Sequence, residues 1–236
     1  PVEFERRHQL TDWEVSTKPG AIHYSMEKSL GAPGPCLGCE GFFGNPINAS
    51  NGNKFQKEDD FAISGLLGFS RYYNSSSAAP THLLGKRWTN TFTRKIEYLV
   101  DRTAGPLIAN ASRPDGKTIK FKNVSGQWLP DADITYKLVR RDDAGGTLIG
   151  LTLTDHTSDL VEEYDAKGRL SSISTSNGES VVLIYNNGVT QNNKNDYLPT
   201  LIVDEKGLAL NFSYDASLRI SKITLPDGTE YSYVYD

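Results

Sequence analysis

The sequence predicts an all-β fold, a curved antiparallel sheet of successive hairpins preceded by a short-stranded N-terminal lead-in. Its 236 residues include 12 Tyr, 9 Phe and 21 Gly, which is typical of strands separated by tight turns. Tyr-Asp or Tyr-Asn pairs recur late in the chain, and the residues around them alternate between apolar and polar. A mostly helical fold is therefore disfavoured.

The overall charge and hydropathy narrow the classes of partner. The formal net charge is -4, and the longest clusters of basic residues are pairs such as Arg140-Arg141, so we expect no nucleic-acid binding. No stretch approaches the roughly 20 apolar residues of a membrane-spanning helix, so no membrane span is expected. Residues 1–9 are polar and lack an initiating Met, and we expect the natural protein to continue beyond Asp236.

Residues 1–43 are predicted to form an extended arm, because periodic apolar residues are few and the segment 31–35 reads Gly-Ala-Pro-Gly-Pro. The arm includes Cys36-Leu37-Gly38-Cys39, whose spacing permits a small-loop disulfide, half of a zinc site or a redox dithiol. A disulfide between Cys36 and Cys39 is the leading expectation. Zinc would need two more ligands from the four histidines, which are His8, His23, His82 and His156. No metal or cofactor is expected.

Residues 44–155 are predicted to form an N-terminal β segment. Its expected strands are 63–73, 88–100, 118–121, 136–140 and 147–154, because short β-branched and aromatic runs lie between turn residues. The turn Pro114-Asp115-Gly116 is of the same type as turns that occur later in the chain.

Residues 156–236 contain a repeat. Its markers are Tyr164-Asp165, Tyr185-Asn186, Tyr214-Asp215 and Tyr235-Asp236, at steps of 21, 29 and 21 residues. The longer step is explained by a polar loop insertion at 190–196. A turn dipeptide lies eight residues before each of the last three pairs, namely Asn177-Gly178, Lys206-Gly207 and Asp227-Gly228. The unit is therefore turn, strand, Tyr-Asp turn, strand.

Alternation within the units predicts one buried face. Leu208, Leu210, Phe212 and Tyr214 should share it, and so should Tyr231, Tyr233 and Tyr235. A single hairpin is marginal in water, so successive hairpins must pair side by side to bury these residues. Core packing is the preferred interpretation of the tyrosines, and ligand recognition is the alternative.

At this point the residues resemble a known family. Residues 164–170, Tyr-Asp-Ala-Lys-Gly-Arg-Leu, and the later turn Pro226-Asp227-Gly228 are similar to the YD repeat of Rhs proteins. The second unit has Leu218 where Gly is usual. Upstream, Gly44-Asn45-Pro46, the run 67–74 and Gly85-Lys86-Arg87-Trp88 resemble the segment that precedes these repeats. Together the resemblances cover roughly residues 44 to 236.

The resemblance implies a function. Rhs proteins are bacterial polymorphic toxins or cell-surface proteins whose repeats form a hollow β cage around a C-terminal toxic domain. The expected role is a wall or end-closure segment of such a cage, in an exported protein. Expected partners are the rest of the shell and its toxin, with secretion machinery or self-association through an open sheet edge as further partners. The structural residues that the resemblance assigns are Trp88, Tyr164, Asp165, Arg169, Tyr185, Tyr214, Asp215, Asp227, Arg219 and Tyr235.

Two other functions remain as alternatives. One is an adhesin-like module that binds carbohydrate or protein through exposed aromatic faces or an open sheet edge. The other is an enzyme, for which the candidate acids are 58–60, 142–143 and Glu162-Glu163. These acidic clusters are expected to be solvated charges near turns or strand edges, and no Gly-x-Ser-x-Gly motif is present. No catalytic residue is therefore assigned.

Overall fold

The computed structural model describes residues 3–6, 13–16, 42–43, 47–48, 53–76, 83–101, 105–185 and 198–235. Within these ranges the chain contains strands and turns but no helix, so the prediction of an all-β fold is confirmed. No described element is a helix long and apolar enough to cross a membrane. The predicted disulfide residues Cys36 and Cys39 and the insertion at 190–196 lie outside the described residues.

The strands form antiparallel sheets of very different size. Two pairs of short strands come first: β1 (Glu3–Arg6) with β2 (Trp13–Ser16), and β3 (Phe42–Phe43) with β4 (Ile47–Asn48). A three-stranded sheet, called the bridging sheet below, contains β5 (Phe55–Ser64), β6 (Leu67–Asn74) and β7 (Trp88–Asn90).

The largest sheet has 13 strands, whose order in the sheet follows the order in the chain. They are β8 (Lys95–Asp101), β9 (Gly105–Ser112), β10 (Thr118–Val124), β11 (Gln127–Pro130), β12 (Tyr136–Asp142), β13 (Leu148–Asp155), β14 (Leu160–Asp165), β15 (Leu170–Thr175), β16 (Ser180–Tyr185), β17 (Pro199–Asp204), β18 (Ala209–Tyr214), β19 (Ile220–Thr224) and β20 (Glu230–Ser232).

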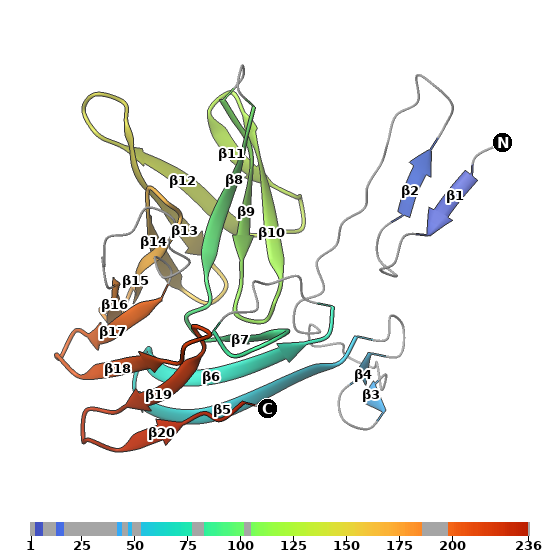
Figure 1. Ribbon diagram of the computed structural model, residues 1–236. Helices are drawn as coiled ribbons and strands as arrows, with labels where there is room; N and C mark the ends of the chain where they lie inside the picture. Colours follow the sequence, from blue (N-terminus) through green and yellow to red (C-terminus); the bar gives the residue numbers. More distant parts are fainter. Residues whose placement is uncertain are drawn as a thin grey trace.

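This large sheet is strongly curved. In Figure 1 strands β8–β11 stand opposite β12–β14, and the later strands turn until β18–β20 run beside the bridging sheet. Strands β8 and β20 are not paired with each other, so the sheet is not closed into a barrel. The predicted curved sheet of successive hairpins is confirmed, and it continues without interruption across residues 155 and 156.

One turn geometry recurs along this sheet. In each case the amide of a first residue donates to the carbonyl four residues later, and the amide of the fourth residue donates to the carbonyl of the first. This is a type I turn followed by a bulge, in which the fourth residue needs a positive φ. The turns begin at Arg113, Asp143, Asp165, Thr175, Asp204, Asp215 and Leu225. Glycine fills the fourth position in six of them, and Leu218, with φ 63°, fills it in the seventh.

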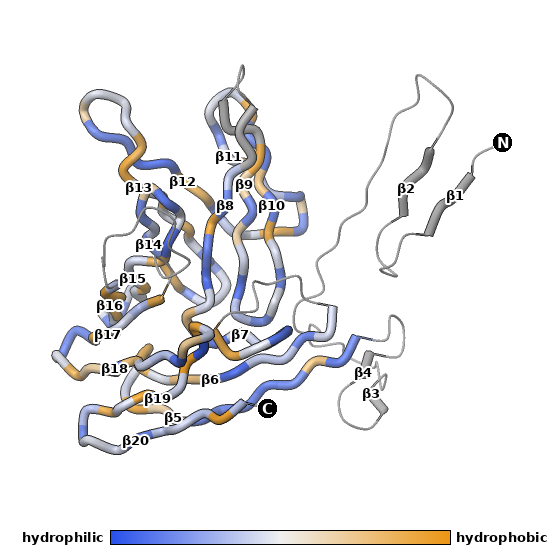
Figure 2. Tube along the Cα trace, viewed as in Figure 1, coloured by the Kyte–Doolittle hydropathy of each residue, from blue (hydrophilic) through white to orange (hydrophobic). Residues whose placement is uncertain are grey.

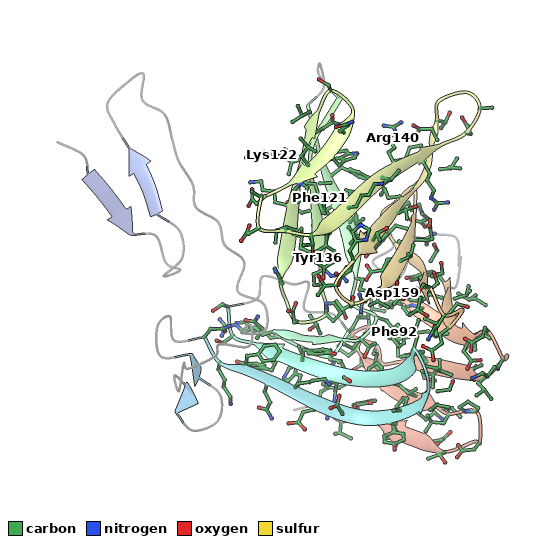
Figure 3. All side chains as sticks on the ribbon, turned by 180° about the vertical axis from the view of Figure 1, so that it is seen from behind. Phe92, Phe121, Lys122, Tyr136, Arg140 and Asp159 are labelled. Atoms are coloured by element: carbon green, nitrogen blue, oxygen red, sulfur yellow. The ribbon has the colours of Figure 1, made fainter. Side chains whose placement is uncertain are left out.

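Alternation along the strands separates the two faces of the sheet. Leu210 and Phe212 are buried, while Asn211 and Ser213 are exposed, as the sequence pattern predicts. Apolar segments recur on the strands that face one another in Figure 2. Figure 3 shows Phe121 and Tyr136 directed into the space between the two groups of upright strands. The curve therefore encloses the hydrophobic core.

Several predicted strands have different bounds in the structure. The predicted strand 63–73 contains a chain reversal at Gly65, whose φ is +42°, so it is a hairpin of β5 and β6. The predicted strand 88–100 is interrupted after Asn90, whose side chain accepts the amide of Phe92 in a tight turn. Strands β9 and β11 were not predicted, since Gly and Pro residues interrupt or border their short apolar runs.

Candidate functional site: tyrosine clasps and the bridging sheet

The Tyr-Asp turns are stabilised by their aspartates. Oδ1 of Asp165 accepts hydrogen bonds from the amides of Lys167 and Arg169, each at 2.9 Å. Its Oδ2 accepts a hydrogen bond from Nε of Arg169 at 2.6 Å. Asp215 makes the same three bonds in the next such turn, to the amides of Ser217 and Arg219 and to Nε of Arg219. A single carboxylate thus orders the turn backbone and fixes the direction of the arginine.

The arginine that each aspartate holds leads to the tyrosine of the following unit. The Arg169 guanidinium lies 5.0 Å from the ring centroid of Tyr185, and that of Arg219 lies 4.1 Å from the ring of Tyr235. These distances place the cation over the negative face of the ring. The unit of Tyr164 is therefore linked to that of Tyr185, and the unit of Tyr214 to that of Tyr235, through an aspartate, an arginine and a tyrosine.

Each of these tyrosines also closes the open end of its own hairpin, an arrangement we call a tyrosine clasp. The hydroxyl of Tyr185 donates to the carbonyl of Leu170 at 2.7 Å, fifteen residues earlier in the chain. Two further clasps have the same spacing: Tyr214 to Pro199 at 2.7 Å and Tyr235 to Ile220 at 2.6 Å. The three clasps close the hairpins β15–β16, β17–β18 and β19–β20.

The clasp hydroxyls remain proton donors at physiological pH. Burial raises the pKa of the Tyr185 and Tyr214 hydroxyls far above the usual tyrosine range, and burial raises the pKa of Tyr235 to about 12. A register shift accompanies Tyr185 and Tyr214 in their strands, which is the signature of a β-bulge. The clasp is thus a neutral hydrogen bond at a bent strand end.

Tyr164 follows a different rule, although its strand has a register shift at the same place. Its side chain is fully buried, and its hydroxyl donates to the carboxylate of Glu162. That carboxylate also accepts a bidentate pair of bonds from Arg113, at 2.5 and 2.6 Å, and a bond from Arg94. The expectation that Glu162 is a solvated charge is therefore wrong.

The burial of Glu162 could have been predicted from the alternation of side chains along a strand. Glu162 lies two residues from Tyr164 and therefore points to the same inward face. Burial by itself would raise the pKa of the Glu162 carboxyl, but the charges of Arg94 and Arg113 hold it below its usual value. The cluster joins the start of β8 and the end of β9 to β14. This cluster stabilises the curve of the large sheet at the point where β8 and β9 approach β14.

The turn after β14 contacts the first strand of the sheet directly. The amide of Ile96 in β8 donates to the carbonyl of Gly168 at 2.9 Å, and Lys95 and Arg169 form an isolated antiparallel bridge. A Cβ atom built on Gly168 would lie 1.9 Å from the carbonyl oxygen of Ile96. Glycine is required here by the close approach of two backbones as well as by its positive φ.

The bridging sheet is tied to the large sheet at both of its ends. At one end Nδ2 of Asn74 donates to the carbonyl of Asp115 at 3.0 Å, and Thr89 bonds to the carbonyl of Pro114 in the same turn. At the other end Oγ of Ser64 donates to Oδ2 of Asp204 at 2.7 Å. These turns follow β9 and β17. The bridging sheet therefore extends across the curve of the large sheet, from the end of β9 to the end of β17 (Figure 1).

Aromatic contacts join the two sheets between these ends. Phe69 in β6 lies 6.0 Å from Phe212 and 6.2 Å from Tyr233, measured between ring centroids. Phe61 lies 4.8 Å from Tyr231. Phe92 lies where the upright strands meet the bridging sheet (Figure 3). The bridging sheet is therefore part of the same hydrophobic core as the repeats.

The remaining residues that the sequence singled out lie outside the tyrosine clasps. Trp88 packs on Tyr73, with ring centroids 5.4 Å apart, and is half-buried in the bridging sheet. Asp227 accepts the amide of Thr229 in the turn between β19 and β20, but it takes no part in a clasp. His156 is exposed, and the other three histidines lie outside the described residues. No group of three metal-ligating side chains occurs among the described residues.

Comparison with known proteins gives a limited result. No curated protein matches the chain. Residues 44–121, which include the bridging sheet and extend into β10, match the model of a family described as a domain of unknown function, DUF6531.

Proposed function

We propose that this chain is a structural segment of an Rhs-type shell, in which β8–β20 form wall and the bridging sheet closes the end. The resemblance of the sequence to Rhs proteins indicates what the shell encloses. It is a C-terminal effector of an exported bacterial toxin that is used in competition. The partners are the rest of the same shell and that effector, and delivery requires secretion machinery. The proposal assigns no catalytic role to any residue.

The observation that carries the proposal is the attachment of the bridging sheet. Its Ser64 end is bonded to Asp204 and its Asn74 end to Asp115, so it crosses the concave side of the curved sheet. A sheet that is attached to the turns after β9 and after β17 limits access to the interior of the curved sheet from the side that it crosses. This is the geometry that an end closure requires.

The repeat geometry supports the role of the later strands as wall. The hairpins β15–β16, β17–β18 and β19–β20 are each closed by a clasp, and the first and third are linked to the preceding Tyr-Asp turn through an arginine. Units that obey such a local rule can be added side by side without changing those already present. The family match supports the proposal weakly, because its description names no function.

The test uses the complete natural polypeptide that contains these residues. Electron cryomicroscopy should reveal a hollow β shell with the bridging sheet at one end, and residues enclosed by it should resist added protease. The variant Ser64→Ala with Asn74→Ala removes one polar attachment at each end, while the bond from Thr89 remains, and it should increase cleavage of the enclosed part. Val182→Thr, on the exposed outer face, is the control. An extended particle, or enclosed residues cut as fast as an unfolded substrate, would overturn the proposal.

A further inference from the structure

We propose that a cleft between the bridging sheet and the last strand binds a neutral sugar ring. The cleft has a volume of about 470 Å³ and lies at the edge of the sheet-to-sheet contact. Volumes of this order are typical of small-molecule sites. The inference goes beyond the proposed structural function and does not depend on it.

The cleft exists because the contact between the sheets ends at Arg71. Leu67 and Phe69 on the same face of β6 are fully buried, whereas the side chain of Arg71 is 29% exposed. On the far side the chain continues from Tyr231 to Tyr235, where Val234 is 93% exposed at the rim of the cleft. The open end of the interface is thus a cleft between two walls.

Both walls are aromatic. Trp88 stands on the bridging sheet, while Tyr233 and Tyr235 stand on the segment that follows β20. An aromatic ring has a negative face, and the C–H bonds of a sugar ring carry a small positive charge. A pyranose can therefore pack the C–H bonds on one side of its chair against such a wall.

The charged groups at the cleft neutralise each other. Asp60 accepts Nε of Arg71 through both oxygens, at 2.8 and 3.0 Å, and also Nη2 at 2.8 Å. Oδ2 of Asp60 further accepts the hydroxyl of Tyr233 at 2.6 Å. The guanidinium lies 5.5 Å from the ring centroid of Trp88 and 5.8 Å from that of Tyr233. The polar groups are consequently fixed in place before any ligand binds.

The donors left over decide the class of ligand. Nη1 of Arg71, Nε1 of Trp88 and the hydroxyl of Tyr231 make no hydrogen bond within the part of the chain that the structure describes. These groups need acceptors, which sugar hydroxyls supply. A phosphate or carboxylate ligand is disfavoured because the cation is already paired with Asp60, and a lipid chain is disfavoured by the polar groups.

The experiment measures binding of trisaccharides to the full chain by calorimetry and tryptophan fluorescence. The probes are trimers of α-linked glucose, β-linked glucose, galactose and N-acetylglucosamine, with a galacturonate trimer as the charged comparison. We expect saturable binding of at least one neutral trimer, with a change in tryptophan fluorescence that is absent in Trp88→Ala. Trp88→Ala should weaken it about two- to tenfold by removing a stacking ring. Tyr231→Phe, which keeps the ring, should weaken it about threefold or more.

Matched measurements separate loss of the site from loss of the fold. Tyr72→Phe makes the same chemical change on the opposite face of β6 and should leave binding unchanged. Circular dichroism checks that Trp88→Ala remains folded, and Tyr231→Phe tests the site if it does not. The proposal is overturned if no neutral trimer binds, if only the galacturonate trimer binds, or if Tyr231→Phe binds as tightly as the unmodified chain.

Discussion

Replacing Gly168 by alanine should destabilise the protein far more than the same change at Gly228. Both glycines occupy the fourth position of the recurrent turn, with φ of 75° and 85°. A Cβ on Gly228 meets no atom within 4 Å, whereas one on Gly168 would lie 1.9 Å from the carbonyl oxygen of Ile96. The comparison therefore separates backbone strain from a steric clash.

The expected magnitudes follow from these surroundings. Alanine in the left-handed region costs about 1–2 kcal/mol, which is the whole effect expected for Gly228→Ala. In Gly168→Ala the turn must also move away from β8, because two backbones cannot overlap. Loss of the bond from the Ile96 amide adds about 1 kcal/mol, and the forced displacement adds about 1–3 kcal/mol. The total for Gly168→Ala is about 3–6 kcal/mol.

Urea unfolding followed by circular dichroism gives the free-energy differences, and amide hydrogen exchange reports on the contact itself. In Gly168→Ala the amide of Ile96 should exchange much faster than in the unmodified chain, while in Gly228→Ala it should be unaffected. Equal destabilisation of the two variants, or unchanged protection of Ile96, would refute the idea that this turn is packed against β8.

Three other substitutions or conditions test the site. Leu218→Gly should stabilise the chain by about 1 kcal/mol in urea unfolding, since it relieves a positive φ in a non-glycine residue; a less stable variant contradicts this. Glu162→Gln should cost about 3–5 kcal/mol in the same assay, because it leaves the buried Arg113 and the largely buried Arg94 without a carboxylate. The same change at the partly exposed Glu163 should cost at most about 1 kcal/mol. Hydrogen bonds from the Arg219 amide and side chain lower the pKa of Asp215, so its contribution is present above the unfolded value of 3.8 and is lost as the pH falls through the folded pKa. Acid titration of unfolding should therefore be less steep in Asp215→Asn, and an unaltered pH profile would contradict the assignment.

Local patterns predicted the repeats well because each repeat is made by local rules. The turn glycines, the inward positions of Leu210 and Phe212, and the alternation of Tyr231 with Ser232 are all determined by residues within one hairpin. The hairpin at Gly65 was missed because it lies within a long run of strand-forming residues. There the chain reverses on a single glycine without a Pro, Asn or Asp to mark it.

The hydrogen bonds between the bridging sheet and the large sheet could not be predicted from local sequence patterns. Ser64 and Asp204 are 140 residues apart, and Tyr233 bonds to Asp60 across 173 residues. A serine or an aspartate at such a position looks like any surface residue until the sheet has curved. Glu162 is an intermediate case, because its inward position was predictable from Tyr164 but its two arginine partners were not.

The tyrosine clasp has a consequence for how the chain reaches this fold. Each clasp joins residues only fifteen positions apart, so a hairpin can close as soon as its own segment is available. Contacts of such short sequence separation form quickly, whereas those that require large loops form slowly. The large sheet can therefore assemble strand by strand in the direction of synthesis, with the attachments of the bridging sheet to Asp204 and Tyr233 forming last. A β structure of this size would then avoid a long-lived, largely unpaired intermediate, in which exposed strands aggregate.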